Sequence, residues 1–277
     1  KKVNKFIIKK FKRKIDIYCC ALGAASEFPQ CFLDLDKEKE KNKIINQSLL
    51  KLETFLKFLK PKVFFPAGGN YLIYGKFYKL NKYIAQPNFQ QILTKTKKIK
   101  TQICNIIGGG YIIFDKLKFS IIPNEKKTRF SQNKYSKKLK NIKYYYSRNS
   151  SKVNLKKLDE KFLKAKENYF KILKKKKNIN TKWDINFNIY KNIVINKNCN
   201  FYQKKSKFLK KYNVKNFNSL KKNVFKLDCF LEDRLFQSLI TGKFPWNTSL
   251  TGSTIMYKRT PNKFNVDMAF SLNFLRA

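Results

Sequence analysis

The sequence predicts an α/β protein, because short apolar runs that suit buried strands are separated by an amphipathic helix. The runs 15–21 and 63–65 are the expected strands. Between them, apolar residues recur every three or four positions, and the pattern ends before Pro61: Ile45, Leu49, Leu52, Leu56 and Leu59. A strand, a helix and a strand in this order indicate a parallel unit, in which ligands bind at the carboxyl ends of the strands.

The remainder of the chain predicts a second kind of structure after a basic connector. Strict alternation over 183–190 is typical of a half-buried strand. Two more amphipathic helices are expected from the spacing of large residues: one from Leu155, Leu158, Phe162, Tyr169 and Leu173, the other from Leu227, Phe230, Leu231, Leu235 and Leu239. We expect the second helix to end at Gly242, and we expect a turn at the glycine triplet 108–110. The last segment, 246–277, predicts a turn, a strand and a closing helix.

These elements divide the chain into three expected parts. Residues 1–125 form an α/β domain, residues 126–180 form a Lys-rich helical connector, and residues 181–277 form a small α+β module.

The charge of the chain has two interpretations. The sequence has 63 basic and 17 acidic residues, so the formal net charge is +46, and 63 − 6 = 57 of the basic residues are lysine. Selection for nucleic-acid binding usually enriches arginine, which makes bidentate phosphate and base contacts. A lysine excess with much Asn, Ile and Phe favours compositional drift instead. Non-specific binding of polyanions is expected under either interpretation.

The most basic segment is residues 126–177. It contains 20 basic and 3 acidic residues, which gives a local charge of 20 − 3 = +17. We interpret it as a solvated surface, with nucleic-acid binding as the alternative. Tyr144, Tyr145 and Tyr146 could stack on bases in that alternative, although consecutive residues of a strand alternate between faces, so that part of the trio at most would face one ligand.

Several classes of function are excluded by composition. The chain has no histidine, so it cannot by itself build an imidazole base, a His-ligated zinc site or a Ser-His-Asp triad. Its six cysteines include no CxxC pair, which suits buried thiols in a reducing cytoplasm. No uncharged stretch has the ~18 residues that a membrane span needs. The first residue is not methionine, which indicates a processed chain or a piece of a longer one.

Three segments, in this order, resemble one protein family. The first is residues 23–32, with the sequence GAASEFPQCF. The second combines Lys60-Pro61-Lys62 and residues 66–71 (PAGGNY) with Gly75-Lys76 and residues 80–83 (LNKY). The third comprises Trp246-Asn247, Gly252-Ser253, Arg259 and Asn273-Phe274. Together they resemble the carboxyl-terminal part of metallo-β-lactamase-fold proteins of the CMP-N-acetylneuraminate hydroxylase-like group, which is akin to the ascorbate-6-phosphate lactonases.

The resemblance implies the C-terminal half of an αββα sandwich, followed here by the small α+β module. In that superfamily most metal ligands come from an amino-terminal His-rich loop, which this sequence lacks. Gly68 stands where a typical member has a metal-binding histidine, and Asp16 is the nearby carboxylate, which cannot make a metal site alone. Zinc, manganese or iron would therefore bind only with ligands from an amino-terminal half. The hydroxylase's Rieske centre also needs Cys and His ligands that are missing here.

The resemblance and the strand ends together predict a substrate-binding site without catalytic residues. Its expected members are the polar and ring-bearing residues of the three segments: Ser26, Gln30, Gly68, Gly69, Asn70, Tyr71, Trp246 and Asn247. Packing or a turn is the alternative role of each. The expected function is that of the C-terminal portion of an enzyme acting on a sugar or nucleotide-sugar, of hydrolase or hydroxylase type and inactive without its missing N-terminal half or a partner subunit. The alternative is a basic nucleic-acid-binding protein or a structural subunit of an RNA-containing assembly.

Overall fold

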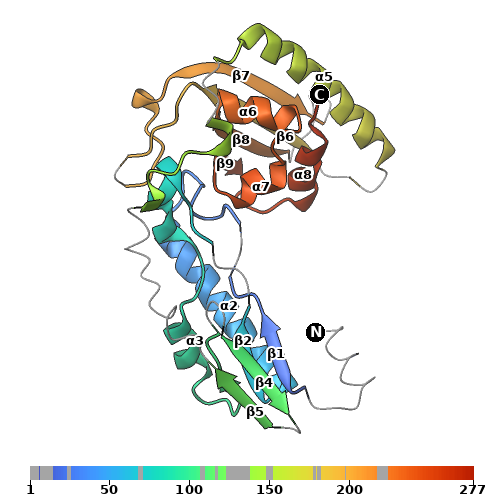
Figure 1. Ribbon diagram of the computed structural model, residues 1–277. Helices are drawn as coiled ribbons and strands as arrows, with labels where there is room; N and C mark the ends of the chain where they lie inside the picture. Colours follow the sequence, from blue (N-terminus) through green and yellow to red (C-terminus); the bar gives the residue numbers. More distant parts are fainter. Residues whose placement is uncertain are drawn as a thin grey trace. The chain divides into compact units, whose positions relative to one another are not determined.

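The computed structural model of the 277-residue chain describes residues 6, 15–23, 26–67, 71–106, 110–115, 118–122, 138–147, 152–176, 179, 182–196, 198–216 and 224–277 (Figure 1). The chain divides into two units. The first contains residues 1–25, 37–71 and 83–135, and the second contains residues 26–36, 72–82 and 136–277. The fold is mixed α/β, as predicted. The second unit contains helix α5 (Leu155–Lys175) together with the C-terminal strands, whereas the sequence predicts this helix as part of a connector.

The first unit is built on the predicted strand-helix-strand arrangement. Strand β1 (Ile17–Cys20) is followed by helix α2 (Lys37–Leu59) and strand β2 (Val63–Pro66), and β1 pairs with β2 in parallel. The five apolar residues spaced along α2 are all buried, as predicted. Four of them, Ile45, Leu49, Leu52 and Leu56, share one core with Phe64 of β2 and Ile92 of helix α3 (Phe89–Thr96), because one face of each helix is apolar.

Further strands complete the described part of this unit. Strand β3 (Gln102–Ile103) joins the sheet in parallel, giving the order β1-β2-β3, and β4 (Tyr111–Asp115) pairs with β5 (Lys118–Ile122) as a hairpin. Helix α3 begins at a capping box, in which the Asn88 side chain accepts from the Gln91 amide and the Gln91 side chain accepts from the Asn88 amide. The turn predicted at 108–110 falls mostly outside the described residues.

The second unit is built on a mixed sheet of order β7-β6-β8-β9, covered by helices α5, α6, α7 and α8 (Figure 1). The strands are β6 (Trp183–Tyr190), β7 (Phe208–Lys215), β8 (Phe225–Glu232) and β9 (Met256–Thr260). The helices are α5, α6 (Asp233–Ile240), α7 (Trp246–Thr251) and α8 (Val266–Ser271). Strand β6 alternates between buried and half-buried residues, as its sequence predicts.

One predicted helix is partly wrong. The segment from Leu227 to Leu231 is strand β8, and helix α6 begins at Asp233. Leu227, Cys229 and Leu231 are buried while the residues between them are half-buried, which is the period of a strand. The helical and strand periods both fit leucines four residues apart, and parallel pairing with β6 selects the strand.

Aromatic side chains form the core between α5, α6 and the sheet. Phe162 of α5 lies 4.6 Å from Tyr212 and 5.9 Å from Phe236, measured between ring centroids, and Phe187 lies 5.7 Å from Trp246. Leu158, Phe162 and Tyr169 face inward as predicted, whereas Leu155 is 36 % exposed. This core fixes α5 and α7 against the sheet. Among the residues that the structure describes, no helix combines the length and apolarity that crossing a membrane requires.

Candidate functional site

The second unit contains a cavity of about 430 Å³, within the roughly 300–1,000 Å³ of small-molecule sites. The turn at 26–28, helix α7, strand β9 and helix α8 with the residues before it surround the cavity. Its walls are formed by Ser26, Glu27, Phe28, Asn247, Leu250, Arg259, Phe264, Val266, Ala269 and Phe270. All ten belong to the same compact unit, so elements of one unit position the site.

The turn that supplies Ser26, Glu27 and Phe28 is fastened to strand β9. The Tyr257 amide donates to the Cys31 carbonyl at 2.9 Å, and the Leu33 amide donates to the Tyr257 carbonyl at 2.7 Å. Within the turn, the Cys31 amide donates to the Glu27 carbonyl at 2.9 Å. These bonds hold one cavity wall on the sheet, although more than 220 residues of sequence separate the two segments.

Arg259 presents the positive charge of the cavity. Its guanidinium carbon lies 4.6 Å from the ring centroid of Phe28 and 4.4 Å from that of Phe32, and its Nε donates to Asn262 Oδ1 at 2.9 Å. Cation–π contacts of this kind orient the guanidinium plane. The arrangement fixes a group that binds carboxylates and phosphates beside an aromatic surface.

Glu27 presents the acidic group. Burial raises the pKa of its carboxyl, while a hydrogen bond from its own backbone amide and the charge of Arg259 oppose that rise. The Glu27 carboxyl therefore takes up a proton more readily than a solvated glutamate, and it can donate or accept a hydrogen bond to a ligand. The hydroxyl of Tyr257 is fully buried and, among the described residues, has no hydrogen-bond partner. Burial, together with the neighbouring Cys229 and Glu27, raises the pKa of Tyr257.

Two of the predicted site residues, Ser26 and Asn247, meet at this cavity. The Ser26 hydroxyl accepts from the Phe28 amide at 3.3 Å, and the Asn247 side-chain oxygen accepts from Asn273 Nδ2 at 3.1 Å. Both side chains thus lie at the cavity wall in positions that neighbouring groups hold. The resemblance of the two segments to one family is the signal that pointed to both.

Two other predicted residues serve the fold. The Gln30 side chain is fully buried and donates to the Ser26 carbonyl and to Ser253 Oγ at 3.2 Å, so it ties the turn to the loop after α7. Trp246 is fully buried, and its indole donates to the Leu275 carbonyl at 3.3 Å. Trp246 therefore offers no ring face to a sugar, contrary to the sequence-based expectation.

Of the four remaining predicted residues, the structure describes one. Gly68, Gly69 and Asn70 are outside the described residues, and the half-buried Tyr71 belongs to the first unit. Sequence reasoning missed the charged pair Glu27 and Arg259 as site residues, although both occur in the segments that carry the resemblance. It also missed the apolar residues of α8 and the loop before it, because their pattern does not distinguish a core face from a cavity wall.

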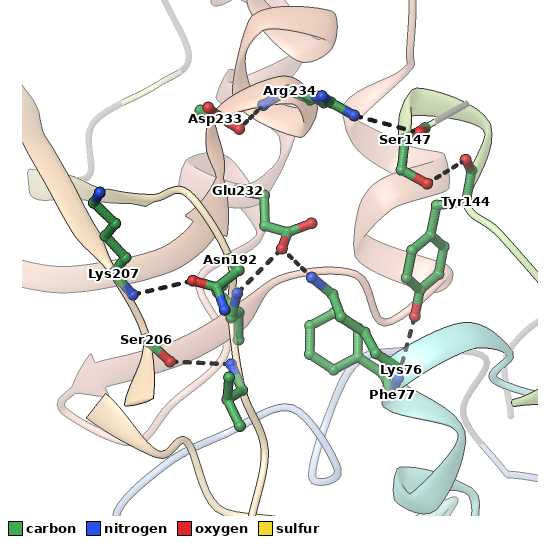
Figure 2. Close-up of polar contacts among 12 residues, drawn as sticks. Lys76, Phe77, Tyr144, Ser147, Asn192, Ser206, Lys207, Glu232, Asp233 and Arg234 are labelled. Atoms are coloured by element: carbon green, nitrogen blue, oxygen red, sulfur yellow. Dashed lines mark hydrogen bonds and ion pairs between the residues drawn. The ribbon is translucent and has the colours of Figure 1, made fainter. Parts of the chain in front are cut away.

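A second polar cluster holds the segment 72–82 against the end of strand β8 (Figure 2). The carboxylate of Glu232 binds the ammonium group of Lys76 and accepts from the Ile193 amide at 3.1 Å. Burial lowers the pKa of Lys76, and the charges of Glu232 and Asp233 oppose this shift. Both partners of the ion pair have other fixed contacts, so the cluster has a structural role: it holds the segment 72–82 at the end of strand β8.

Tyr144 also holds the segment 72–82 in place. Its hydroxyl donates to the Tyr74 carbonyl at 2.6 Å. The same hydroxyl accepts from the Phe77 amide at 3.3 Å (Figure 2). Its ring stacks on Tyr146 at 5.2 Å, and both rings are buried, while Tyr145 is 66 % exposed. Gly75 has φ +65°, and a Cβ at that position would lie 2.8 Å from the Tyr144 ring. Tyr144 and Tyr146 therefore cannot stack on bases, which corrects that part of the alternative prediction.

Metal ligands are not gathered in the described part of the chain. No group of three or more His, Cys, Asp or Glu side chains able to hold a metal ion occurs among the described residues. Asp16, the carboxylate considered from the sequence, forms an ion pair of 2.9 Å with Lys62. These residues do not fit a metal centre, so we derive no metal-dependent step from this chain.

Comparisons with protein families, with characterised proteins and with solved structures found no match for this chain.

Proposed function

We propose that the chain is the C-terminal portion of a metallo-β-lactamase-fold enzyme that acts on a sugar or nucleotide-sugar, and that the cavity of its second unit holds part of the substrate. The hydrolase or hydroxylase chemistry would require a metal centre supplied by an N-terminal half or a partner subunit. The observation that carries the proposal is the meeting of Ser26 and Asn247, two residues of separate family-like segments, at one cavity.

The chemistry of the cavity supports such a ligand. The Arg259 guanidinium suits a phosphate or carboxylate, because it carries a permanent charge and several donors. Glu27 and Asn247 can exchange hydrogen bonds with sugar hydroxyls, and the ring of Phe28 offers a face to a base or sugar ring. The net charge of +46 also favours an anionic substrate.

Calorimetric titration of the purified chain tests this proposal with three probes: CMP-N-acetylneuraminate, N-acetylneuraminate and CMP. We expect saturable binding of at least one probe, weakened about tenfold by Arg259→Gln, since the loss of one charged contact is worth about 1.4 kcal/mol or more. Lys156→Gln on the exposed surface of α5 removes the same charge away from the cavity, and we expect it to leave the affinity unchanged. Absence of saturable binding for all three probes would rule the proposal out.

The second candidate function is binding of nucleic acid, alone or as a structural subunit of an RNA-containing assembly. The observation that favours it is the exposed surface of α5, where six lysines face solvent: Lys156, Lys157, Lys164, Lys171, Lys174 and Lys175. Against it, Tyr144 and Tyr146 are packed inside the fold. A stable stoichiometric RNA complex at physiological salt would favour this candidate over the enzyme portion.

A further inference from the structure

The walls of the cavity are more apolar than a sugar alone requires. Six of the ten lining residues are apolar. Three contribute aromatic rings and three contribute aliphatic groups: Phe28, Phe264 and Phe270, and Leu250, Val266 and Ala269. Sugar sites depend on several hydrogen-bonding groups, whereas here the polar groups are confined to Ser26, Glu27, Asn247 and Arg259. The cavity therefore suits a ligand that has one large apolar part.

Three large apolar residues at this cavity are strongly exposed. Phe264 is 67 %, Val266 is 64 % and Phe270 is 55 % exposed, and all three lie within seven residues around the start of α8. Single exposed apolar residues are ordinary, but a cluster beside a cavity indicates a binding surface. Two other residues of α8, Met268 and Ser271, are buried and anchor the helix. Val266 and Phe270 thus belong to an anchored helix, and Phe264 lies just before it.

The polar groups of the cavity determine which head group the ligand can carry beside its apolar part. Arg259 is oriented by two aromatic rings and by Asn262, so it can meet an anionic head group without reorganisation. Glu27 lies at the same cavity and can hydrogen-bond that head group in its protonated form. A cavity with an apolar wall next to this charged pair suits an amphipathic anion as its ligand.

We propose that the cavity binds the acyl chain of an amphipathic anion, of the class of fatty carboxylates and acyl phosphates, with the head group at Arg259 and the chain along Val266 and Phe270. The inference uses the same cavity as the proposed function, but it does not depend on the enzyme class proposed above. A protein partner is the other conceivable occupant of an apolar surface, but the guanidinium and carboxyl inside the concavity favour a small molecule with a charged end.

Decanoate is the probe for the test, and acetate is its matched control because it has the same head group without the chain. The full-length chain is titrated with each by calorimetry, at a salt concentration high enough to suppress binding to the lysine-rich surface. We expect saturable binding of decanoate and none of acetate. Val266→Ser and Phe270→Ser should each weaken decanoate binding about tenfold, because each removes apolar contact area from the chain.

Leu163→Ser is the control variant, since Leu163 is 59 % exposed on α5 and does not line the cavity. All three changes are at exposed side chains, so the fold should persist, and circular dichroism checks this. Arg259→Gln should weaken decanoate binding while leaving decanol binding unchanged, which separates the head group from the chain.

Four outcomes decide the inference. Decanoate binding that Val266→Ser and Phe270→Ser leave intact would place the ligand elsewhere and overturn it. Self-association that Phe270→Ser abolishes, without decanoate binding, would make the surface an interface between copies and also overturn it. Binding of a sugar or nucleotide probe without decanoate binding would overturn this inference and leave the proposed function standing. Wall-dependent decanoate binding without any sugar or nucleotide binding would support the inference and reject the proposed function.

Discussion

Glu27 and Arg259 show how single side chains define the cavity. Glu27 belongs to a turn and Arg259 to strand β9. The aromatic rings of Phe28 and Phe32 lie against the Arg259 guanidinium. The carboxyl of Glu27 is held where water solvates it poorly, so its pKa is raised despite the nearby positive charge. A group of this kind links ligand binding to protonation, and its effect on stability can be measured directly.

Glu27→Gln should remove a pH dependence from the free energy of unfolding. Because the pKa of Glu27 in the folded chain lies above the ordinary value of 4.5, the folded state binds this proton more tightly than the unfolded state. The stabilisation is complete below about 4.5 and is lost as the pH rises through the folded-state pKa. Urea unfolding at a series of pH values from 4.5 upward should therefore show the variant gaining stability relative to the native chain. Glu160→Gln, at an exposed site of α5, is the control, and equal pH slopes for native chain and Glu27→Gln would contradict the assignment.

Glu232→Gln should destabilise the second unit, because it leaves the ammonium group of Lys76 without its charged partner. The expected loss is about 1 kcal/mol, less than for a fully buried pair, because the Lys76 side chain is 31 % exposed and water partly replaces the lost partner. Chemical unfolding measures the loss. The double variant Lys76→Met, Glu232→Gln should lose less than the sum of the two single changes, since both partners are then removed. Strict additivity would show that the ion pair does not fasten the segment.

At the scale of elements, local periodicity predicts some parts of this fold and fails for others. Helix α2 and strand β6 are predicted correctly because each buries one face and its own residues show the period. Strand β8 is not, since Leu227 and Leu231 fit both a strand and a helix, and pairing with β6 decides between them. That pairing joins residues about forty positions apart, which no local pattern contains.

The candidate site shows the same division. Ser26 and Asn247 could be proposed from motifs, because each occurs in a recognisable segment. Phe264, Val266 and Phe270 could not, since large apolar residues near a helix are ordinarily core residues, and exposure depends on what the rest of the chain covers. Trp246 illustrates the opposite error, because a residue expected at a ligand is a core residue.

Helix α8, which carries much of the cavity wall, depends on a buried chain of hydrogen bonds that joins three elements. The Trp183 indole of β6 donates to the Tyr169 hydroxyl of α5 at 2.7 Å, and that hydroxyl lies 3.0 Å from Ser271 Oγ of α8. The Ser271 hydroxyl in turn donates to the Met268 carbonyl at 2.7 Å. All three side chains are fully buried, so no water replaces a lost partner.

Tyr169→Phe should therefore cost about 1–3 kcal/mol of stability, because the Trp183 indole loses its acceptor inside the core. Since α8 would lose the same anchor, we expect decanoate to bind more weakly to this variant than to the native chain. Thermal unfolding and calorimetric titration give the two values. Tyr145→Phe removes the hydroxyl of a 66 % exposed tyrosine and should change neither. A stable Tyr169→Phe chain would show that the hydrogen-bond chain does not anchor α8.

At the scale of the whole molecule, the chain has many more positive charges than its acidic residues can neutralise. The sequence has 63 basic residues for 17 acidic ones, so the acids can neutralise only 17 of the 63 positive charges whatever the fold. The lysines that the structure describes are distributed over α2 and α3 of the first unit as well as α5 of the second. This distribution favours drift over a dedicated recognition surface, and the salt dependence of RNA binding can distinguish the two.

Replacing four lysines of α5 by glutamine should weaken RNA binding no more than replacing four lysines of the first unit. The α5 set is Lys164, Lys171, Lys174 and Lys175, and the matched set is Lys43, Lys51, Lys97 and Lys98, all exposed. If the charge is unspecific, each set should lower the slope of log affinity against log salt by the same amount, at most about 3 at roughly 0.7 per phosphate contact. Fluorescence anisotropy with an unstructured oligouridine over a salt series measures both slopes. A loss confined to the α5 set would instead locate a nucleic-acid surface there and favour the second candidate function, because unspecific charge has no preferred helix.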